Sequence, residues 1–322
     1  MASAAHLFAV LRALFFFILV FMAVQACTPP RNVIHSGKVT PKGQVKVGAD
    51  VTGNFTSHFA RSLYKNVEAI VEPLVNKDSL QLDEQILNLN RTALAYAIDP
   101  FGAGYGFYAR YGFTKGLDMG YRLASGTHVF DAMYQFAGSK GTIDEPEEGM
   151  LHGSIGFQYG FKNYSLPGWS DLKLAQKILD FNLKRKDILV PLIFSVGIGP
   201  EETYGAVSFG LAYSHTFLDY GFGNSRIYDT LNSVSPEIVA SIHDKKHFPA
   251  WGAFFNLKLG YSFIYIIPAC ALYYQNYGTY NLIDGSTASF KGVSLTPSLG
   301  LQLNLMEIEN LMKKNKKPKP QL

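Results

Sequence analysis

The segment SLTPSLGLQLNL, residues 294–305, indicates the fold class of this 322-residue chain. Its odd positions, from Leu295 to Leu305, are apolar, and its even positions carry Ser, Thr, Gly, Gln and Asn. Successive side chains of a β-strand point to opposite faces, so this alternation predicts a strand with one apolar and one polar face. The same pattern predicts about ten strands, the others lying at 45–51, 104–113, 117–123, 130–136, 151–161, 188–199, 207–213 and 250–276, where the last segment holds two strands with a turn near 260–263.

The aromatic residues favour a barrel in a membrane. The chain has 24 Phe and 19 Tyr, many of them near strand ends, while the opposite strand faces carry Gly, Ser and charged residues. An apolar outside with aromatic girdles and a polar inside is typical of transmembrane barrels. We therefore predict an all-β fold, a transmembrane antiparallel β-barrel. A secreted sandwich or soluble barrel is one alternative, and a helical membrane protein, suggested by the uncharged stretch 259–283, is another.

Composition excludes several other classes. Two cysteines cannot form a disulfide scaffold, and a mean hydropathy of +0.05 is too low for a bundle of transmembrane helices. Residues 306–322 hold five lysines against two glutamates, so they account for most of the formal charge of +4. The excess charge therefore indicates a Lys-rich C-terminal tail and not a basic body, and we expect no nucleic-acid partner.

The first 27 residues resemble a bacterial lipoprotein signal. Arg12 precedes an apolar run at 13–24, which leads into Val24-Gln25-Ala26-Cys27. A basic start, an apolar middle and a small residue before a cut are the parts of a secretory signal, and a cysteine directly after the cut is similar to the lipobox. The resemblance implies a signal peptide at 1–26 and a covalent lipid on Cys27, although Gln25 departs from the usual pattern. An uncleaved signal anchor and a plain secretory signal remain alternatives.

The last predicted strand resembles the signal that the bacterial barrel-assembly machinery reads. The matching positions are Ser298, Gly300, Leu303 and Leu305, and the segment departs from the pattern because it ends in leucine and not in an aromatic residue. The segment 35–43 is similar to barrel lipoproteins of Bacteroidota. These resemblances imply an outer-membrane barrel lipoprotein of a Gram-negative bacterium, with outer-membrane lipid and the assembly machinery as partners.

The domain organisation follows from these features. We predict a signal peptide at 1–26, a lipid-anchored tether at 27–44, a barrel at 45–305 and the tail at 306–322. If both ends of the barrel lie in the periplasm, 114–116 forms a periplasmic turn and the inserts at 56–103, 162–187 and 219–249 share the other end. The lipid-anchored N-terminus is then expected on the periplasmic side.

The insert at 57–98 has helical periodicity. An apolar stripe predicts a helix at 57–75, and Ser79 is a candidate cap for a second helix that carries Ile86 and Leu94. We expect these two helices to form a lid over the barrel or a plug within it.

The polar strand faces place seven charged side chains in the lumen: Lys46, Asp50, Arg110, Asp118, Arg122, Asp131 and Lys258. Buried charges must be paired and hydrogen-bonded, so a network that closes the barrel is the first interpretation. A polar path for a solute, or a docking site for a plug, is the second. Asp118 and Arg122 lie four apart on one strand, so we expect each to pair with a neighbouring strand.

Two motifs contain residue types that could carry catalytic or metal chemistry. His152-Gly153-Ser154 is similar to the His-any-Ser dyad of outer-membrane lipid A deacylases, but no third member is identifiable by spacing, and activation of a serine needs an oriented base. The acidic cluster 144–148 lacks metal-ligand spacing. We therefore expect no enzyme, no metal and no cofactor other than the lipid on Cys27.

Three roles fit the sequence. A channel or transporter for small or hydrophobic solutes, similar to a porin, requires a continuous lumen. A structural or accessory subunit of an envelope complex requires a filled lumen and a protein partner. A membrane-embedded acyl hydrolase requires His152 and Ser154 beside an acid and near lipid.

Overall fold

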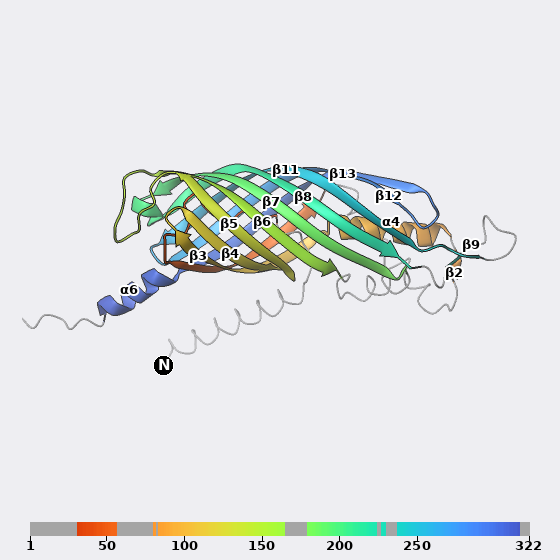
Figure 1. The fold of residues 1–322 in the computed structure, drawn as a ribbon, viewed down its shortest axis with the longest axis horizontal. Coiled ribbons are helices and arrows are strands. Elements are labelled where there is room, and N and C mark those ends of the chain that lie inside the picture. Colours follow the sequence, from red (N-terminus) through yellow and green to blue (C-terminus); the bar gives the residue numbers. More distant parts are fainter. Residues whose placement is uncertain are drawn as a thin grey trace, which may run out of the picture.

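The computed structural model describes residues 31–56, 80–81, 83–164, 179–223, 227–229 and 237–315. Within them, ten antiparallel strands close into a barrel, because β1 pairs with both β13 and β3 (Figure 1). The predicted all-β barrel of about ten strands is thus confirmed. The barrel strands are β1 (Val45–Thr56), β3 (Gly102–Thr114), β4 (Leu117–Ala124), β5 (Thr127–Ala137), β6 (Leu151–Tyr164), β7 (Phe181–Ile198), β8 (Gly205–Phe222), β11 (Ile242–Tyr261), β12 (Ile264–Asn281) and β13 (Thr287–Asn304).

The connections at the two ends of the barrel differ in length. At one end, called the short-turn end, the strands are joined by 115–116, 138–150, 199–204 and 262–263. The last of these is the turn predicted near 260–263. The opposite end carries the short turns 125–126 and 282–286 and the three longest connections, 57–101, 165–180 and 223–241, so the three predicted inserts do share one end. We call it the α4 end, after the helix α4 (Glu84–Ile98).

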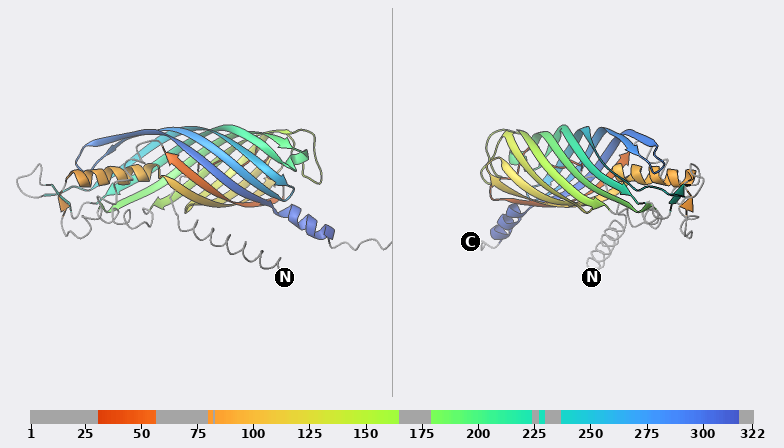
Figure 2. Two further views of the ribbon diagram at one scale, coloured as in Figure 1. Left: turned by 180° about the vertical axis from the view of Figure 1, so that it is seen from behind. Right: turned by 45° about the vertical axis from the view of Figure 1, so that its right-hand side comes forward.

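The smaller elements lie at both ends. Figure 2 shows α4 at one end of the barrel and α6 (Leu305–Asn315) at the other. A small sheet beside α4 consists of β2 (Leu80–Gln81), β9 (Ile227–Asp229) and β10 (Glu237–Ile238), and the 3-10 turn η2 (Pro200–Glu202) joins β7 to β8. The cap of α4 is Asp83, whose side chain accepts a hydrogen bond from the Ile86 amide, and not Ser79. The helix predicted at 57–75 lies outside the described residues.

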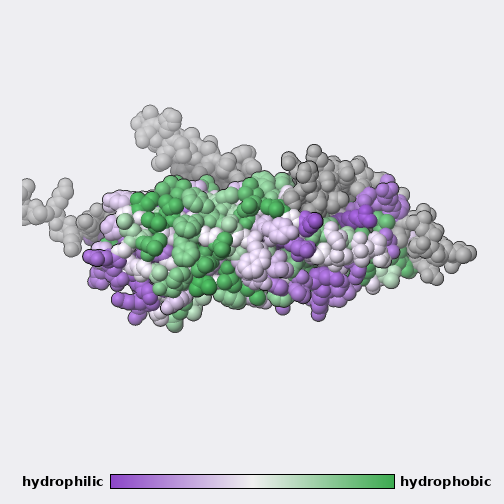
Figure 3. All heavy atoms as spheres, turned by 90° about the horizontal axis from the view of Figure 1, so that it is seen from above, coloured by the Kyte–Doolittle hydropathy of each residue, from purple (hydrophilic) through white to green (hydrophobic). Residues whose placement is uncertain are grey.

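An apolar belt surrounds the barrel on the side of the short-turn end. Figure 3 shows hydrophobic residues gathered over this part of the surface, with hydrophilic residues at both ends. Its exposed side chains include Phe107, Phe157 and Leu211, and aromatic pairs such as Tyr204 with Tyr261 stand near the ends of strands. A belt of this kind is the lipid-facing surface of a transmembrane barrel. No helix in the described part of the chain is long and apolar enough to span a membrane.

Beyond the belt, towards the α4 end, the two strand faces exchange their chemical character, with polar side chains outside and apolar side chains inside. Along β7, Val190 and Val196 face outward within the belt, but nearer the α4 end Lys184 and Lys186 are exposed and Leu183 is buried. Long strands on this side of the barrel therefore continue past the belt with apolar side chains inside. They enclose α4 in an apolar core that includes Ile86, Leu89, Leu94, Phe181, Leu218, Phe222, Phe248, Tyr277, Tyr280 and Leu282.

Leu211→Arg tests the position of the belt. Leu211 is 62% exposed within it, and an arginine on the lipid face near the bilayer centre costs about 2–4 kcal/mol. We expect the free energy of unfolding, measured with urea in lipid vesicles, to fall by an amount in this range. The control is Ile238→Arg, at a site with similar exposure (57%) in β10, which should change stability little. Equal losses for the two variants would contradict this placement of the belt.

Candidate functional site: the filled lumen

The lumen holds a segment of the protein's own chain. Residues 31–44, named here the N-terminal segment, run through the barrel from the α4 end to the short-turn end before β1 begins. Residues 31–34 and 36–40 are buried, and His35 is half-buried. This range belongs to the tether predicted at 27–44, and nothing in its sequence pattern indicated that it would lie inside the barrel.

Near the α4 end, the N-terminal segment is bound to several strands. The Tyr273 hydroxyl of β12 donates to the Arg31 carbonyl at 2.6 Å. The Asn32 amide donates to the Asp50 carboxylate and to the Thr52 hydroxyl of β1, both at 2.8 Å. A single asparagine thus uses both of its amide hydrogens on the barrel wall, which holds the start of the segment against β1.

Towards the short-turn end, the backbone of the N-terminal segment pairs with side chains of the wall. These contacts replace the partners that a buried extended backbone lacks. The bonds are Asn256 Nδ2 to the carbonyls of Val33 (3.2 Å) and His35 (3.1 Å), the Gly37 amide to Ser195 Oγ (3.0 Å), the Val39 amide to Gln135 Oε1 (3.2 Å) and the Thr40 amide to Asp118 Oδ2 (2.7 Å). A side chain at Gly37 would collide with the carbonyl of His152, so glycine permits the approach to β6.

All seven charged residues predicted for the lumen lie buried inside the barrel. Arg110 of β3 pairs with Asp118 of β4 (2.5 Å) and with Asp131 of β5 (2.7 Å). The second pair crosses over β4 at Gly120, which is the register partner of both Arg110 and Asp131. A Cβ atom at this glycine would collide with the Asp131 carboxylate. The absence of a side chain therefore lets the guanidinium reach across two strand spacings.

A second arginine also pairs with a carboxylate across a glycine of an intervening strand. Arg122 of β4 pairs with Asp50 of β1 at 2.6 Å, across the intervening strand β3. Gly106 stands opposite Asp50 on β3, and a Cβ atom there would collide with the Asp50 carboxylate and the Arg122 guanidinium. Asp118 thus pairs with the neighbouring strand β3, as predicted, whereas Arg122 reaches past its neighbour to β1; the two residues do not pair with each other.

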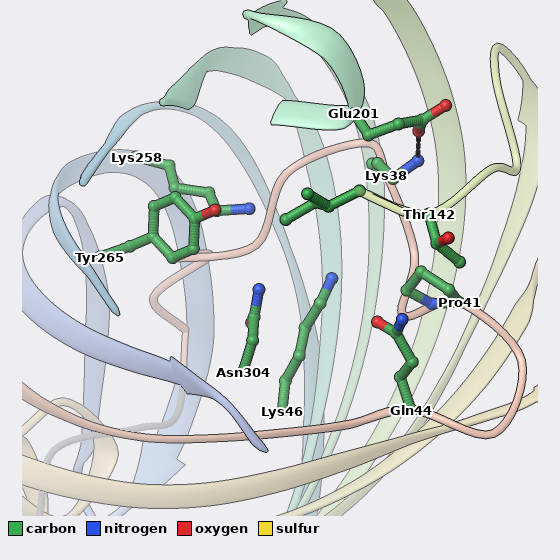
Figure 4. A pocket seen from close by; sticks show the side chains of 10 residues that line it. Lys38, Pro41, Gln44, Lys46, Thr142, Glu201, Lys258, Tyr265 and Asn304 are labelled. Carbon is green, nitrogen blue, oxygen red and sulfur yellow. Dashed lines mark hydrogen bonds and ion pairs between the residues drawn. The ribbon is translucent and has the colours of Figure 1, made fainter. Parts of the chain in front are cut away.

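Two glutamates of the β7–β8 connection, Glu201 and Glu202, fold back into the short-turn end of the lumen, and Figure 4 shows Glu201 beside Lys38. Lys38 of the N-terminal segment pairs with Glu201, and Lys258 of β11 pairs with Glu202 at 3.0 Å. The Ser36 hydroxyl also donates to Glu202, at 2.8 Å. Burial alone would raise the pKa of Glu202, but Lys258 and Lys46 outweigh burial and hold this pKa below its ordinary value. Lys46 has no carboxylate within 4 Å in the described part of the chain.

A second polar layer closes the lumen beneath α4. Asp99, which follows α4, lies 3.7 Å from Arg31 and accepts hydrogen bonds from Tyr277 and Gln275. Arg185 pairs with Asp187 at 2.7 Å, and its guanidinium donates to the carbonyl of Ile98 at the end of the helix. This layer binds the C-terminal end of α4 to the barrel and separates the polar lumen from the apolar core around the helix.

His152 and Ser154 do not form a catalytic pair in the described structure. Both side chains are buried in the lumen, on the face opposite the lipid-facing residues. His152 Nδ1 lies 3.8 Å from Glu202, and neither its ring nitrogens nor Ser154 Oγ have a hydrogen-bond partner among the described residues. An acyl chain in the surrounding membrane would therefore have to cross the barrel wall to reach Ser154.

The remaining predicted sites are the acidic cluster, the assembly-signal positions and the lipidation site. In the acidic cluster 144–148, Glu147 accepts from the Lys140 amide and Asp144 accepts from Asn310 of α6, and no cluster with metal-ligand geometry occurs in the described ranges. Of the assembly-signal positions, Ser298, Gly300 and Leu303 lie on β13, while Leu305 is the first residue of α6. Cys27 lies outside the described residues.

Several lumen residues escaped prediction. Glu201 and Glu202 adopt positive φ angles of 52° and 60°, so their turn bends back into the barrel, and a Pro-Glu-Glu sequence alone resembles a solvated loop. Asn32 and Lys38 precede the first alternating strand and carry no periodicity of their own. Charge balance is the one signal that could have pointed to a further buried carboxylate. The seven predicted lumen charges comprise four cations and three anions and so leave one cation without a partner.

Comparisons with known proteins found solved structures only. No family model and no curated protein matches the chain. Among the solved structures are Neisserial surface protein A (11% identity, 80% of this chain and 96% of that one, TM-score 0.29), the attachment invasion locus protein Ail of Yersinia pestis (12%, 82% and 99%, 0.29) and the outer membrane protein OprG of Pseudomonas aeruginosa (10%, 84% and 99%, 0.29). These scores are low, and the barrel described above rests on the strand pairing of this chain itself.

Arg110→Met tests the pairing network. The substitution leaves Asp118 and Asp131 buried without their cation, and breaking a buried pair in this way costs about 3–5 kcal/mol. We expect the free energy of unfolding to fall by that amount, and the triple variant Arg110→Met, Asp118→Asn, Asp131→Asn to recover part of the loss because it removes the uncompensated charges. A single variant as stable as the wild type would show that the network is not required.

Proposed function

We propose that this chain is an outer-membrane barrel lipoprotein that closes its own lumen and serves as a structural or accessory subunit at the bacterial envelope. The observation that carries the proposal is the buried N-terminal segment. It occupies the path that a solute would take, and side chains from the wall satisfy its backbone groups. A channel or transporter needs a continuous lumen, so the filled barrel favours the non-transporting role.

The membrane assignment draws on the belt and on the chain ends. The apolar belt, the polar lumen and the closed sheet together suit a bacterial outer membrane. We further propose that the chain is cleaved before Cys27 and acylated there, as its resemblance to lipoprotein signals implies. Insertion would then be carried out by the barrel-assembly machinery acting on β13, in a Gram-negative bacterium such as a member of the Bacteroidota.

The α4 end is the part of the molecule best suited to bind a partner. Beyond the belt, α4 and the strand extensions form a compact apolar core with a polar surface that includes Lys184, Lys186 and His243. Such a module projects from the membrane on a rigid wall. We therefore place contacts with another envelope protein there, and we propose no enzymatic activity, since Ser154 and His152 are enclosed in the lumen.

Single-channel recording in planar lipid bilayers tests this function. We expect the purified wild-type protein to give no steady conductance, because the N-terminal segment and its ion pairs fill the lumen. The matched variant replaces residues 32–39 by a Gly/Ser sequence of equal length. This variant should conduct, since it lacks Asn32, Lys38 and the buried apolar side chains Val33, Ile34 and Val39. Steady conductance of the wild type at the level of the variant would refute the closed barrel and favour a channel.

A further inference from the structure

The direction of the N-terminal segment determines the end at which the chain enters the barrel. Asn32 contacts Thr52, which lies towards the α4 end of β1. Thr40 contacts Asp118 near the start of β4, at the short-turn end, and Gly43 donates to the Gly112 carbonyl there. The segment therefore runs from the α4 end to the short-turn end, and its first described residue, Arg31, is the one nearest the α4 end.

The height of Arg31 relative to the belt is also defined. Its carbonyl is bound by Tyr273 of β12. The next residue on the outer face, Tyr274, is 59% exposed and is the last apolar side chain that β12 presents outward, because Asn276 follows it. On β7 the change from Ile188 to Lys186 on the outer face marks the same boundary. Arg31 thus lies level with the edge of the belt that faces α4.

Chain length then limits where Cys27 can be. It precedes Arg31 by four residues, and four extended residues span at most about 14 Å. The apolar band of an outer-membrane barrel is about 25 Å tall. Cys27 therefore cannot reach the membrane surface at the short-turn end, but it can reach the surface at the α4 end.

The unequal connections orient the barrel. Bacterial barrels keep short turns in the periplasm and long connections outside, and here all three long connections belong to the α4 end. We propose that the acyl chains on Cys27 are inserted in the outer leaflet of the outer membrane, on the cell-surface side, so that the protein is anchored outside and threaded inward through its own barrel. This rests on the proposed lipidation and reverses the periplasmic anchor expected from the sequence.

The anchor also explains how the N-terminal segment is kept inside the lumen. A lipid held within about 14 Å of Arg31 prevents the N-terminal segment from sliding towards the periplasm. At the other end, the covalent link to β1 through the turn at 41–44 prevents it from leaving outward. The segment is therefore fixed at both mouths of the lumen, and the barrel is closed by its covalent structure as well as by its ion pairs.

Labelling of single cysteines in living cells tests the proposal. In a Cys270→Ser background, the thiol probes are Pro30→Cys near the anchor, Asp284→Cys in the β12–β13 turn at the α4 end and Glu145→Cys in the β5–β6 connection at the short-turn end. A membrane-impermeant maleimide is applied to intact cells and to lysed cells. Radioactive palmitate reports acylation in the same strains, with Cys27→Ala as the control that should lose the label.

The expected result is palmitate incorporation that depends on Cys27, with Pro30→Cys and Asp284→Cys labelled in intact cells as well as after lysis, and Glu145→Cys labelled only after lysis. If palmitate is incorporated but Pro30→Cys reacts only after lysis while Asp284→Cys reacts in intact cells, the outer-leaflet anchor is wrong and lipidation stands. Palmitate incorporation that is absent, or independent of Cys27, overturns the proposed lipidation itself. Labelling of Glu145→Cys alone in intact cells overturns the orientation.

Discussion

An ionised side chain enclosed by a membrane-spanning wall must be compensated within that wall, because the surrounding lipid offers no counter-charge. In the described part of this chain, the barrel interior holds equal numbers of cationic and anionic side chains. The buried cations of the barrel interior are Arg31, Lys38, Lys46, Arg110, Arg122, Arg185 and Lys258, and its anions are Asp50, Asp99, Asp118, Asp131, Asp187, Glu201 and Glu202; Glu307 is also buried but belongs to α6, which follows the last strand. Two of these cations, Arg31 and Lys38, come from the N-terminal segment, so the charges of the barrel interior balance only when this segment is in place.

This constraint explains features that otherwise look unrelated. Gly106 and Gly120 stand on polar strand faces because Arg122 and Arg110 must cross them to reach their carboxylates. The β7–β8 turn bends inward because Lys38 and Lys258 need its two glutamates. Above the membrane, where water can solvate charges on the outer face, the constraint is lifted, and the same strands turn apolar side chains inward around α4.

Much of the barrel was predictable from the sequence, and the part that was not has a physical reason. Lipid enforces strict alternation, so segments such as 207–213 and 294–305 were visible. Strand ends at 181–187 and 214–222 were missed because their outer faces meet water. Lys184, Lys186 and Asp219 lie on these outer faces, so the outside is polar there and the inside is apolar. The predicted lumen charges could be identified from their strand phase, whereas the N-terminal segment could not: its backbone is bonded to side chains of the wall, and this kind of pairing leaves no period in the sequence.

Amide hydrogen exchange, followed by mass spectrometry on the protein in lipid, tests most directly whether the N-terminal segment fills the lumen. The amides of Gly37, Val39 and Thr40 donate to buried side chains of the wall. Peptides covering 33–40 should therefore exchange as slowly as peptides from β8 and far more slowly than the exposed loop at 144–149. Exchange of 33–40 at the rate of that loop would contradict a plugged barrel.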